Sequence, residues 1–356
     1  MLELRSPEGA FERIESWLRE RGFFAPDGSG DRLVADLYVG YGLSEPLRRG
    51  GHPARPEPCP ALPLAAVAVR TADSAENDRG QSRGLSPVRI GRWERSWTSA
   101  EYAHAVDEVR AAIARGDVYQ VNLVQHLSAP FAGEPRALVP ALSLLRPLAP
   151  YLKGDGWAIV SASPELFLAR RGRRVWTMPI KGTRPLGEHV EGEKDEAEHT
   201  MIVDLERNDL SRVCEPGSVR WPELMAEREL AGVTHLVSRV EGTLRDDVGL
   251  AALLRATFPG GSVTGAPKLA ALDEIARLEP VGRGASMGAL GRVHGNGDLE
   301  LALTIRTFAV AGGRIHLWVG GGVVWDSDPA EEVEESWTKA RPLLAAIGAP
   351  VEELVG

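Results

Sequence analysis

Two runs of alternating apolar and polar residues near the C-terminus constrain the fold most strongly. These runs are LALTIRTFAV (301–310) and RIHLWVGGGVVW (314–325), and only AGG separates them. Alternation with a period of two is typical of β-strands. So short a link joins antiparallel neighbours, because parallel strands need a long crossover. The chain is therefore predicted to contain an antiparallel sheet in its C-terminal part.

Further strands and helices follow one another irregularly. VYQVNLVQHL (118–127) and LPLAAVAVR (62–70) also have strand patterns. Helices are expected over residues 7–21, 98–116, 194–204, 267–277 and 329–347. The second of these has the clearest boundaries, because Thr98 and Glu101 match a capping box and Gly116 is a good terminator. Strands with short links, interspersed with helices, predict an α+β fold with mixed, largely antiparallel sheets.

Composition divides the chain near residue 97. Residues 1–97 form a short N-terminal region that is expected to contribute to the fold. It contains a proline-dense stretch over 44–63, which excludes regular helix, and a polar stretch over 73–87, which is typical of an exposed loop. Residues 98–356 carry the candidate catalytic motifs and are predicted to form the catalytic domain.

Charge and cysteine content narrow the class of protein. Of the 356 residues, 43% are hydrophobic and 26% charged, as in an ordinary globular protein. The net charge is -9 with both signs interspersed, which gives no sign of nucleic-acid or membrane binding. Cys59 and Cys214 form no spacing motif, which fits a reducing compartment. No signal-peptide pattern and no apolar run near the ~20 residues of a membrane span is evident. A cytoplasmic protein is expected.

Two pairs of acidic residues are candidates for a metal site. KDEAEH places Asp195 and Glu198 three residues apart, and EEVEES places Glu332 and Glu335 likewise, each on an expected helix. Residues three apart share a helix face. Two facing helices would thus offer four carboxylates, the ligands of a hard cation such as Mg²⁺. Taken alone, either pair is more commonly a solvated helix face.

A glycine-rich stretch is a candidate anion site. GGSVTGAPK (260–268) places Ser262 and Thr264 ahead of Pro267, a residue suited to the first turn of a helix. Such a turn offers backbone N–H groups and hydroxyl groups to an anionic substrate. The spacing does not fit a Walker phosphate loop, since no Gly-Lys-Ser/Thr follows.

Glycines and an arginine interrupt the apolar C-terminal strands. VGGGVV contains Gly320, Gly321 and Gly322, and glycine inside a strand indicates either a close approach to a ligand or a β-bulge. Arg306 lies within LTIRTF. A buried arginine requires an anionic partner, and its guanidinium matches a carboxylate in a two-point contact. A water-facing position on an edge strand is the alternative.

An acid and a lysine lie where strands are expected to end. Glu165 follows Ser-Pro in SASPELFL, and Lys181 lies between an apolar run and a glycine in MPIKGTRP. A strand, a turn and a returning strand would bring both to one pocket. A carboxyl group there acts as a general acid, and a desolvated lysine as a nucleophile. Without further context, Lys181 is more simply read as a solvent-facing turn residue.

Nine stretches together resemble the chorismate-utilising enzymes, and among them component I of aminodeoxychorismate synthase. They occur in the family's order over roughly residues 98–345: GDVYQVNL, SASPELF, PIKGTRPLG, AEHTMIVDLERNDLSRVCEPGSV, HLVSRVEGTL, FPGGSVTGAPK, LTIRT, GGGVVWDSDP and EEVEESWTKA. The resemblance implies mixed β-sheets that form a sandwich flanked by helices, as in component I of anthranilate synthase. It also implies a deep cleft that binds chorismate with Mg²⁺ as cofactor.

The resemblance implies a role for each matched position. Glu198 and Glu335 match direct metal ligands, with Asp195 and Glu332 in support through water. Glu165 matches the general acid that protonates the departing C4 hydroxyl. His235 matches a histidine of the pocket that orients the substrate. The other matched positions surround the substrate carboxylates: Arg306, Gly320, Gly321 and Gly322 for the enolpyruvyl group, and Gly182, Thr183, Ser262 and Lys339 for the ring.

Two positions separate the branches of the resembled family. Anthranilate synthases carry alanine where this chain has Lys181. In the aminodeoxychorismate branch, that lysine is understood to attack C2 of chorismate as the C4 hydroxyl leaves, and ammonia then expels it. Water-adding relatives carry a lysine base at the position of Gln120, and glutamine cannot deprotonate water. Both positions favour aminodeoxychorismate synthase component I, in p-aminobenzoate and folate biosynthesis, over anthranilate synthase component I.

Two departures from the family pattern support a further alternative. Ser286 and Arg292 stand where the family usually has aromatic residues, so a chorismate-binding subunit without turnover also fits. Neither cysteine lies in a glutaminase-type elbow. The resemblance therefore predicts that ammonia comes from a separate glutamine amidotransferase subunit.

Overall fold

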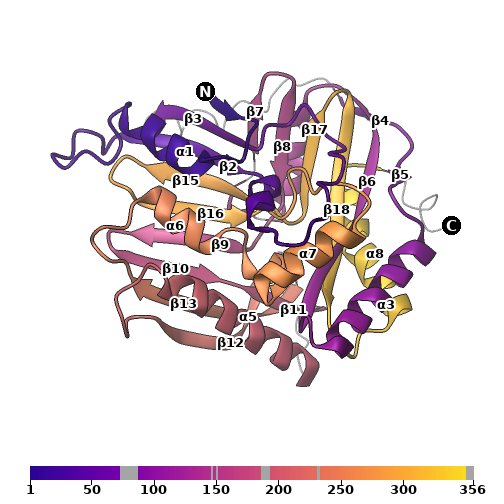
Figure 1. Ribbon diagram of the computed structural model, residues 1–356. Coiled ribbons are helices and arrows are strands. Elements are labelled where there is room, and N and C mark those ends of the chain that lie inside the picture. Colours follow the sequence, from indigo (N-terminus) through magenta and orange to yellow (C-terminus); the bar gives the residue numbers. More distant parts are fainter. Residues whose placement is uncertain (73–86, 146, 150, 186–192, 231–232, 350–356) are drawn as a thin grey trace.

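The computed structural model of the chain describes residues 1–72, 87–145, 147–149, 151–185, 193–230 and 233–349 (Figure 1). For residues 183–185, 193–195, 230 and 233, the description is limited to the backbone. The helices of these ranges are α1 (Ala10–Arg19), η1 (Tyr41–Leu47), α3 (Ser99–Arg115), η3 (Pro135–Leu138), α4 (Val139–Ser143), α5 (Glu193–Ser211), α6 (Leu250–Thr257), η4 (Gly261–Val263), α7 (Lys268–Leu278) and α8 (Pro329–Ala346), where η marks a 3₁₀ helix.

Within the described ranges the strands form two sheets, and the larger has ten strands whose pairings are antiparallel. Their order is β1-β3-β2-β15-β16-β9-β10-β13-β11, and β12 also pairs with β13. The bounds are β1 (Leu2–Leu4), β2 (Leu33–Val39), β3 (Ala65–Thr71), β9 (Leu166–Arg171), β10 (Arg174–Met178), β11 (Ile180–Pro185), β12 (Arg220–Leu230), β13 (Val233–Thr243), β15 (Ala289–His294) and β16 (Leu299–Leu303). Strands from residues 1–97 thus belong to the same sheet as strands of the C-terminal part.

The smaller sheet has eight strands, and its described pairings are antiparallel as well. Their order is β14-β6-β18-β17-β8-β7, with β4 and β5 pairing along β6. The bounds are β4 (Arg89–Ile90), β5 (Glu94–Arg95), β6 (Gln120–Ala132), β7 (Tyr151–Gly154), β8 (Trp157–Ser161), β14 (Gly265–Ala266), β17 (Thr307–Ala311) and β18 (Arg314–Val323). The α+β prediction is confirmed.

The main hydrophobic core joins the two sheets. It contains Leu168 and Leu301 from the larger sheet and Ile159 and Trp318 from the smaller one. Helices α1, α5 and α6 lie over the larger sheet, and α3 and α8 lie beside each other at the smaller one (Figure 1). A second cluster attaches α8 to the smaller sheet through Trp337 and other apolar residues. The two sheets form the expected sandwich flanked by helices. No helix within the described ranges has the length and apolar content needed to cross a membrane.

The predicted helix over 98–116 is confirmed in detail. Helix α3 begins after Thr98, whose hydroxyl accepts a hydrogen bond from the backbone of Glu101 (3.2 Å), while the Glu101 carboxylate accepts one from the Thr98 backbone (2.6 Å). The helix ends at Gly116, whose φ of 82° lies in the left-handed region that favours glycine. The predicted loop over 73–87 lies almost entirely outside the described residues.

The prediction of a single strand over 301–310 is wrong. The chain forms β16 in the larger sheet and β17 in the smaller one, and residues 304–306 carry it from one sheet to the other. Arg306 lies at this crossing with a φ of 49°, which no strand residue adopts. Apolar alternation continues through the crossing, because both strands bury their side chains in the same sandwich.

A second crossing runs alongside the first. Residues 162–165 lead from β8 of the smaller sheet to β9 of the larger one. Backbone hydrogen bonds join the two crossings: Ala162 N–H donates to the carbonyl of Arg306 (2.9 Å), and Leu303 N–H donates to that of Glu165 (3.0 Å). Two of the predicted site residues, Glu165 and Arg306, therefore lie on neighbouring crossings at the seam between the sheets.

A buried ion pair fixes the loop after α7 against β6. The side chains of Glu279 and Arg283 are 4% and 1% exposed, and their two hydrogen bonds measure 2.7 and 2.9 Å. Arg283 also donates to the carbonyls of Val263 (2.8 Å) and Asn122 (2.6 Å), and Glu279 accepts from the backbone of Val124 (3.0 Å). These contacts hold η4 beside the start of β6.

We expect Glu279→Ala to lower the free energy of unfolding by about 3–5 kcal/mol, because it leaves the Arg283 charge buried without its partner. Denaturant unfolding measures this change. Asp204→Ala is the matched control, since it breaks an exposed ion pair with Arg207 and is expected to change stability little. Equal losses in the two variants would contradict the assignment of Glu279 to a structural ion pair.

Candidate active site

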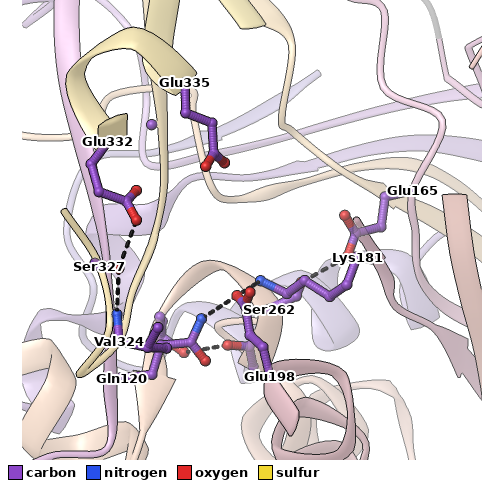
Figure 2. A network of polar contacts seen from close by, with 12 residues as sticks. Gln120, Glu165, Lys181, Glu198, Ser262, Val324, Ser327, Glu332 and Glu335 are labelled. Carbon is purple, nitrogen blue, oxygen red and sulfur yellow. Dashed lines mark hydrogen bonds and ion pairs between the residues drawn. The ribbon is translucent and has the colours of Figure 1, made fainter. Parts of the chain in front are cut away.

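Lys181 lies in a partly buried ion pair. It is the second residue of β11, where the pairing with β13 shifts register between Lys181 and Arg184. Gly182 has a φ of 62° at this bulge, a conformation that glycine adopts without strain. The Lys181 Nζ donates to Glu198 Oε1 over 2.7 Å, and the two side chains are 12% and 13% exposed (Figure 2). The reading of Lys181 as a solvent-facing turn residue is therefore wrong.

Charge around Lys181 is strongly acidic. Burial lowers the pKa of its ammonium group, but attraction to Glu198, the hydrogen bond to it, and the charges of Glu165 and Glu335 together raise this pKa above its ordinary value. The three carboxylates come from the seam, from α5 and from α8. A predicted nucleophile, the predicted acid and two predicted metal ligands thus lie within electrostatic reach of one another.

Gln120 also contacts Glu198. It is the first residue of β6, and its Nε2 donates to Glu198 Oε1 over 2.6 Å (Figure 2). A Cβ atom added to Gly322 would lie 2.0 Å from Gln120 Nε2 and 2.5 Å from Glu198 Oε1. Strand β18 keeps a continuous register with β6 through its glycines. Gly322 therefore marks a close approach of side chains to the backbone, and the β-bulge alternative is wrong there.

Glu165 has the environment of a general acid. It is buried, and the hydroxyl of Ser262 in η4 donates to its Oε1 over 2.7 Å (Figure 2). Burial raises the pKa of Glu165, and the hydrogen bond from Ser262 and the charges of Lys181 and Arg306 oppose this rise without cancelling it. A carboxyl group with a raised pKa keeps its proton to higher pH, as a general acid requires.

Arg306 and His235 approach the same site from two other elements. His235 on β13 donates from Nδ1 to the carbonyl of Gly182 (2.7 Å), which fixes its ring beside β11. Burial lowers the pKa of His235; the bond to Gly182 opposes this, and the charges of Arg306 and Lys339 reinforce it. Burial likewise lowers the pKa of Arg306, and Glu165 opposes the shift. The charges of Arg306 and Lys339 thus favour the neutral form of the His235 imidazole.

Helix α8 carries the second acidic pair. Glu332 is buried and accepts a hydrogen bond from Ser327 Oγ (2.6 Å; Figure 2). Glu335 Oε1 accepts one from Lys339 Nζ (2.6 Å). Lys339 Nζ also donates to the carbonyl of Gly320 (2.8 Å). A Cβ atom added to Gly321 would lie 3.1–3.4 Å from all three of these charged side chains. The glycines of β18 thus leave room for the acidic side chains of α5 and α8 to lie against this strand.

The donor set fits a hard cation. Glu198, Glu332 and Glu335 supply carboxylate oxygens, which are the ligands that Mg²⁺ prefers. Lys181 and Lys339 place ammonium groups against Glu198 and Glu335, so positive charge already stabilises both carboxylates. Among the residues whose side chains are described, no three acids, histidines or cysteines lie close enough together to form a ready-made metal site. The side chain of Asp195, the fourth predicted acid, lies outside the described part.

Three other positions singled out in the sequence, Thr264, Ser286 and Arg292, have partners outside this group. The side chain of a fourth, Thr183, lies outside the described part. Thr264 is fully buried, and its hydroxyl donates to the carbonyls of Gly260 (2.9 Å) and Gly261 (3.3 Å), so it braces the glycine-rich loop. Arg292 lies on β15 and pairs with Asp36 of β2 (3.4 Å). Ser286 is buried, and its hydroxyl lies 3.4 Å from the carbonyl of Thr304 at the seam.

Sequence reasoning missed the residues that anchor this loop from behind. Lys268 Nζ contacts the Asp209 carboxylate of α5 and donates to the carbonyls of Pro259 (2.7 Å) and Thr257 (3.3 Å). Glu206, one turn earlier on α5, is also buried. The sequence did contain a signal: RND places Asp209, and GAPK places Lys268, at helix positions that otherwise face the core. Single charges of this kind are, however, common on exposed helix faces.

The sequence model of the protein family described as "chorismate binding enzyme" matches residues 63–345 of this chain. The chain belongs to this family. The matched region begins ahead of the nine motifs and includes β3 of the larger sheet. The family is therefore shown by the match to this region of the sequence.

Relatives of both aminating branches are similar to the chain. It is 41% identical over 270 residues to anthranilate synthase component 1 of Streptomyces coelicolor, covering 72% of this chain and 53% of that one. It is 38% identical over 285 residues to aminodeoxychorismate synthase component 1 of Bacillus subtilis, covering 76% and 61%. The chain thus spans little more than half the length of these curated relatives. Overall identity does not separate the two activities.

Solved structures give the same fold. Anthranilate synthase component I from Streptococcus pneumoniae TIGR4 superposes with a TM-score of 0.73 at 27% identity, covering 87% of this chain and 80% of that one. The predicted likeness to anthranilate synthase component I is confirmed for the fold.

Proposed function

We propose that this chain is the component I subunit of an aminodeoxychorismate synthase, which converts chorismate and ammonia to 4-amino-4-deoxychorismate. The single observation that carries the proposal is Lys181. Its amine is buried within electrostatic reach of Glu165 and Glu198, where an alanine would offer no nucleophile. The alternative readings, anthranilate synthase component I and a binding subunit without turnover, give this lysine no chemical role.

The proposed reaction proceeds in two displacements. Lys181 first gives its ammonium proton to water, and its neutral amine then forms a bond to C2 of chorismate. Both conjugated double bonds of the ring shift, and the bond from C4 to its hydroxyl oxygen breaks. Glu165 gives its proton to that oxygen, so water leaves. Ammonia then bonds to C4, both double bonds shift back, and the C2–nitrogen bond breaks to release the Lys181 amine. The new ammonium group on C4 returns a proton to Glu165. A covalent intermediate divides one difficult substitution into two easier ones.

The other residues of the site bind and orient in this proposal. Arg306 and the backbone of β18 bind the enolpyruvyl carboxylate, and Lys339 and Ser262 lie on the side of the ring carboxylate. His235, neutral and fixed by Gly182, orients the substrate beside Lys181. Mg²⁺ held by Glu198 and Glu335, with Glu332 and Asp195 in support, would neutralise and polarise the carboxylate-bearing ring. Gln120 stands where a base for water would be needed and supplies none.

Ammonia comes from a separate glutamine amidotransferase subunit in this proposal. Both cysteines of the chain are buried, and burial raises the pKa of Cys59 to about 12 and that of Cys214 to about 11. Thiols with such pKa values are poor nucleophiles for glutamine hydrolysis.

A product assay tests the proposal against its alternatives. The purified chain is incubated with chorismate, Mg²⁺ and an ammonium salt, and products are resolved by liquid chromatography and mass. Aminodeoxychorismate, or p-aminobenzoate after addition of its lyase, supports the proposal. Anthranilate as the product would instead establish the branch of the Streptomyces coelicolor relative. Chorismate that binds and stays unchanged would favour a subunit without turnover.

We expect Glu165→Gln to lower kcat by about 10²–10⁴-fold, because the amide cannot protonate the leaving hydroxyl group. Chorismate binding should change far less, since the amide keeps the shape and the bond from Ser262. Initial rates and equilibrium binding measure the two effects separately. Glu300→Gln, at an exposed carboxylate of the neighbouring strand β16, is the matched control. A kcat for Glu165→Gln within a few-fold of the wild type would remove Glu165 from the reaction.

A further inference from the structure

Two amide side chains of β6 have unused hydrogen-bonding groups beside the site. Gln120 is 1% exposed and Asn122 is 6% exposed. Among the described residues, neither Gln120 Oε1 nor Asn122 Nδ2 has a hydrogen-bond partner. A buried polar group without a partner is costly, because it has given up its hydrogen bonds to water. A ligand that contacts both groups would supply the missing bonds.

Both amides lie on the same face of β6. Residues two apart in a strand share a face, and Asn122 pairs directly with Gly322 of β18. A Cβ atom added to Gly322 would lie 3.1 Å from Gln120 Cδ, so the Gln120 amide lies over that glycine. Directly opposed residues of an antiparallel pair have Cβ atoms about 4.5–5.5 Å apart. The two amides are therefore neighbours, at the glycine that Glu198 also approaches.

Their surroundings fix both amides in place. Gln120 Nε2 donates to Glu198 Oε1 over 2.6 Å (Figure 2). A carboxylate accepts hydrogen bonds but donates none, so the nitrogen of Gln120 faces Glu198 and its oxygen is left as an acceptor. The backbone N–H of Asn122 donates to the carbonyl of Thr264 (2.8 Å), and its carbonyl accepts from Arg283 (2.6 Å). The pair thus offers one acceptor and one donor from a fixed strand.

One acceptor beside one donor matches ammonia in its reactive form. Ammonia donates its N–H groups and accepts at its lone pair, whereas the ammonium ion only donates and would oppose the N–H group of Asn122. Lys181 Nζ donates to the same Glu198 oxygen as Gln120 Nε2, over 2.7 Å. These two nitrogens are therefore no further apart than the two hydrogen bonds together. Ammonia bound to the amides would lie beside the proposed nucleophile.

The other ligands of the proposed reaction already have partners. Arg306 and Lys339 bind carboxylates of chorismate in the proposed function, and Glu165 protonates its C4 hydroxyl group. Ammonia has no residue assigned to it there. Neutral amides suit it better than a carboxylate would, because a nearby negative charge favours the unreactive ammonium ion.

We propose that Gln120 and Asn122 bind the ammonia of the second displacement. An N–H group of ammonia donates to Gln120 Oε1, and its lone pair accepts from Asn122 Nδ2. The inference rests on the proposed function, in which ammonia attacks C4. As the lone pair turns from Asn122 to carbon, the nitrogen gains positive charge, and its hydrogen bond to Gln120 Oε1 becomes stronger. The bonds that form and break are those of the proposed reaction.

Initial rates at varied ammonia concentration test this proposal. Asn122→Leu removes one hydrogen bond and should raise the KM for ammonia by about tenfold, the equivalent of one such bond. The KM for chorismate should change by a few-fold at most. Asn208→Leu, at an exposed position of α5, is the matched control and should leave both values in place. An unchanged KM for ammonia in Asn122→Leu, or a KM for chorismate raised by the same factor, would overturn the proposal.

Stability gives a readout that needs no turnover. The Nδ2 group of Asn122 has no partner among the described residues, so its replacement by an apolar side chain of similar size should be neutral or stabilising. Asn122→Leu should therefore unfold at the same temperature as the wild type or at a higher one, with no substrate present. A clearly lower unfolding temperature would assign Asn122 to the fold and refute the ammonia site.

The product separates the ammonia site from the proposed function. A chain that makes no amino product would end the proposed function, and the ammonia site with it. Anthranilate as the product would end the aminodeoxychorismate branch, while the KM for ammonia of Asn122→Leu would still decide the site. Aminodeoxychorismate formed with an unchanged KM for ammonia in that variant would end the site and leave the proposed function standing.

Discussion

Lys181→Ala is expected to lower aminodeoxychorismate formation on the order of a thousandfold or more, because removal of a covalent nucleophile leaves only binding and electrostatic stabilisation. Ammonia would then have to displace the C4 hydroxyl directly, without the intermediate that divides the step. The measurement is the initial rate with chorismate, Mg²⁺ and an ammonium salt, with products separated by mass.

The design of this experiment separates chemistry from folding. Lys153→Ala removes an exposed lysine from β7 and serves as the matched control. Loss of the Lys181 charge also leaves Glu198 without its ion pair, so chorismate binding and thermal unfolding are measured on each variant. Mass spectrometry of the wild type, denatured during turnover, should detect the substrate adduct on the peptide that contains Lys181. Unchanged turnover in Lys181→Ala, or anthranilate as its wild-type product, would refute the covalent role.

Glu198→Gln is expected to raise the Mg²⁺ concentration needed for half-maximal activity by at least about a hundredfold, since the loss of even an outer partner of a metal ligand costs 10–100-fold. In the proposed site the carboxylate of Glu198 would carry the charge that attracts the cation, and a neutral amide would not replace it. Mg²⁺ titrations of activity and calorimetric titrations of Mg²⁺ binding measure the same shift independently.

Glu198 has a second contact, so a parallel variant is needed. It pairs with Lys181, whereas Glu335 pairs with Lys339 of its own helix. If both glutamates are ligands, Glu335→Gln should raise the Mg²⁺ requirement as well, and excess Mg²⁺ should recover part of the activity in each variant. Glu331→Gln, at an exposed position of α8, is the control. Loss of activity in Glu198→Gln alone, at an unchanged Mg²⁺ requirement, would assign Glu198 to Lys181 and not to a metal.

Much of the candidate site could be predicted from the sequence because its residues break local rules. Lys181 follows an apolar run, Arg306 interrupts an apolar pattern, and glycines occupy β18 where β-branched residues would be more stable. Each of these choices is unfavourable locally and requires a compensating contact elsewhere in the fold. The structure supplies such contacts for Lys181 at Glu198 and for Gly322 at the side chain of Gln120.

The seam between the sheets could not be predicted in the same way. Alternation with a period of two indicates that one face of a strand is buried. It does not indicate which sheet the strand belongs to. The pattern of 301–310 therefore continues through the crossing at Arg306, where the backbone leaves the β region. The partner of each carboxylate could not be predicted from the sequence either. Contacts such as that of Glu206 with Thr177 depend on how α5 packs over β10.

The seam also sets when the site comes into existence as the chain folds. Ser262 and Glu165 are 97 residues apart in sequence, and Gln120 and Glu198 are 78 apart. Contacts between such distant segments form late, because the entropy of closing long loops is lost before they give any stabilisation. Within the described residues, no isolated helix, hairpin or single sheet contains Lys181, Glu165, Glu198 and Glu335 together. The candidate site is therefore a property of the completed sandwich, and it forms only in the last stage of folding.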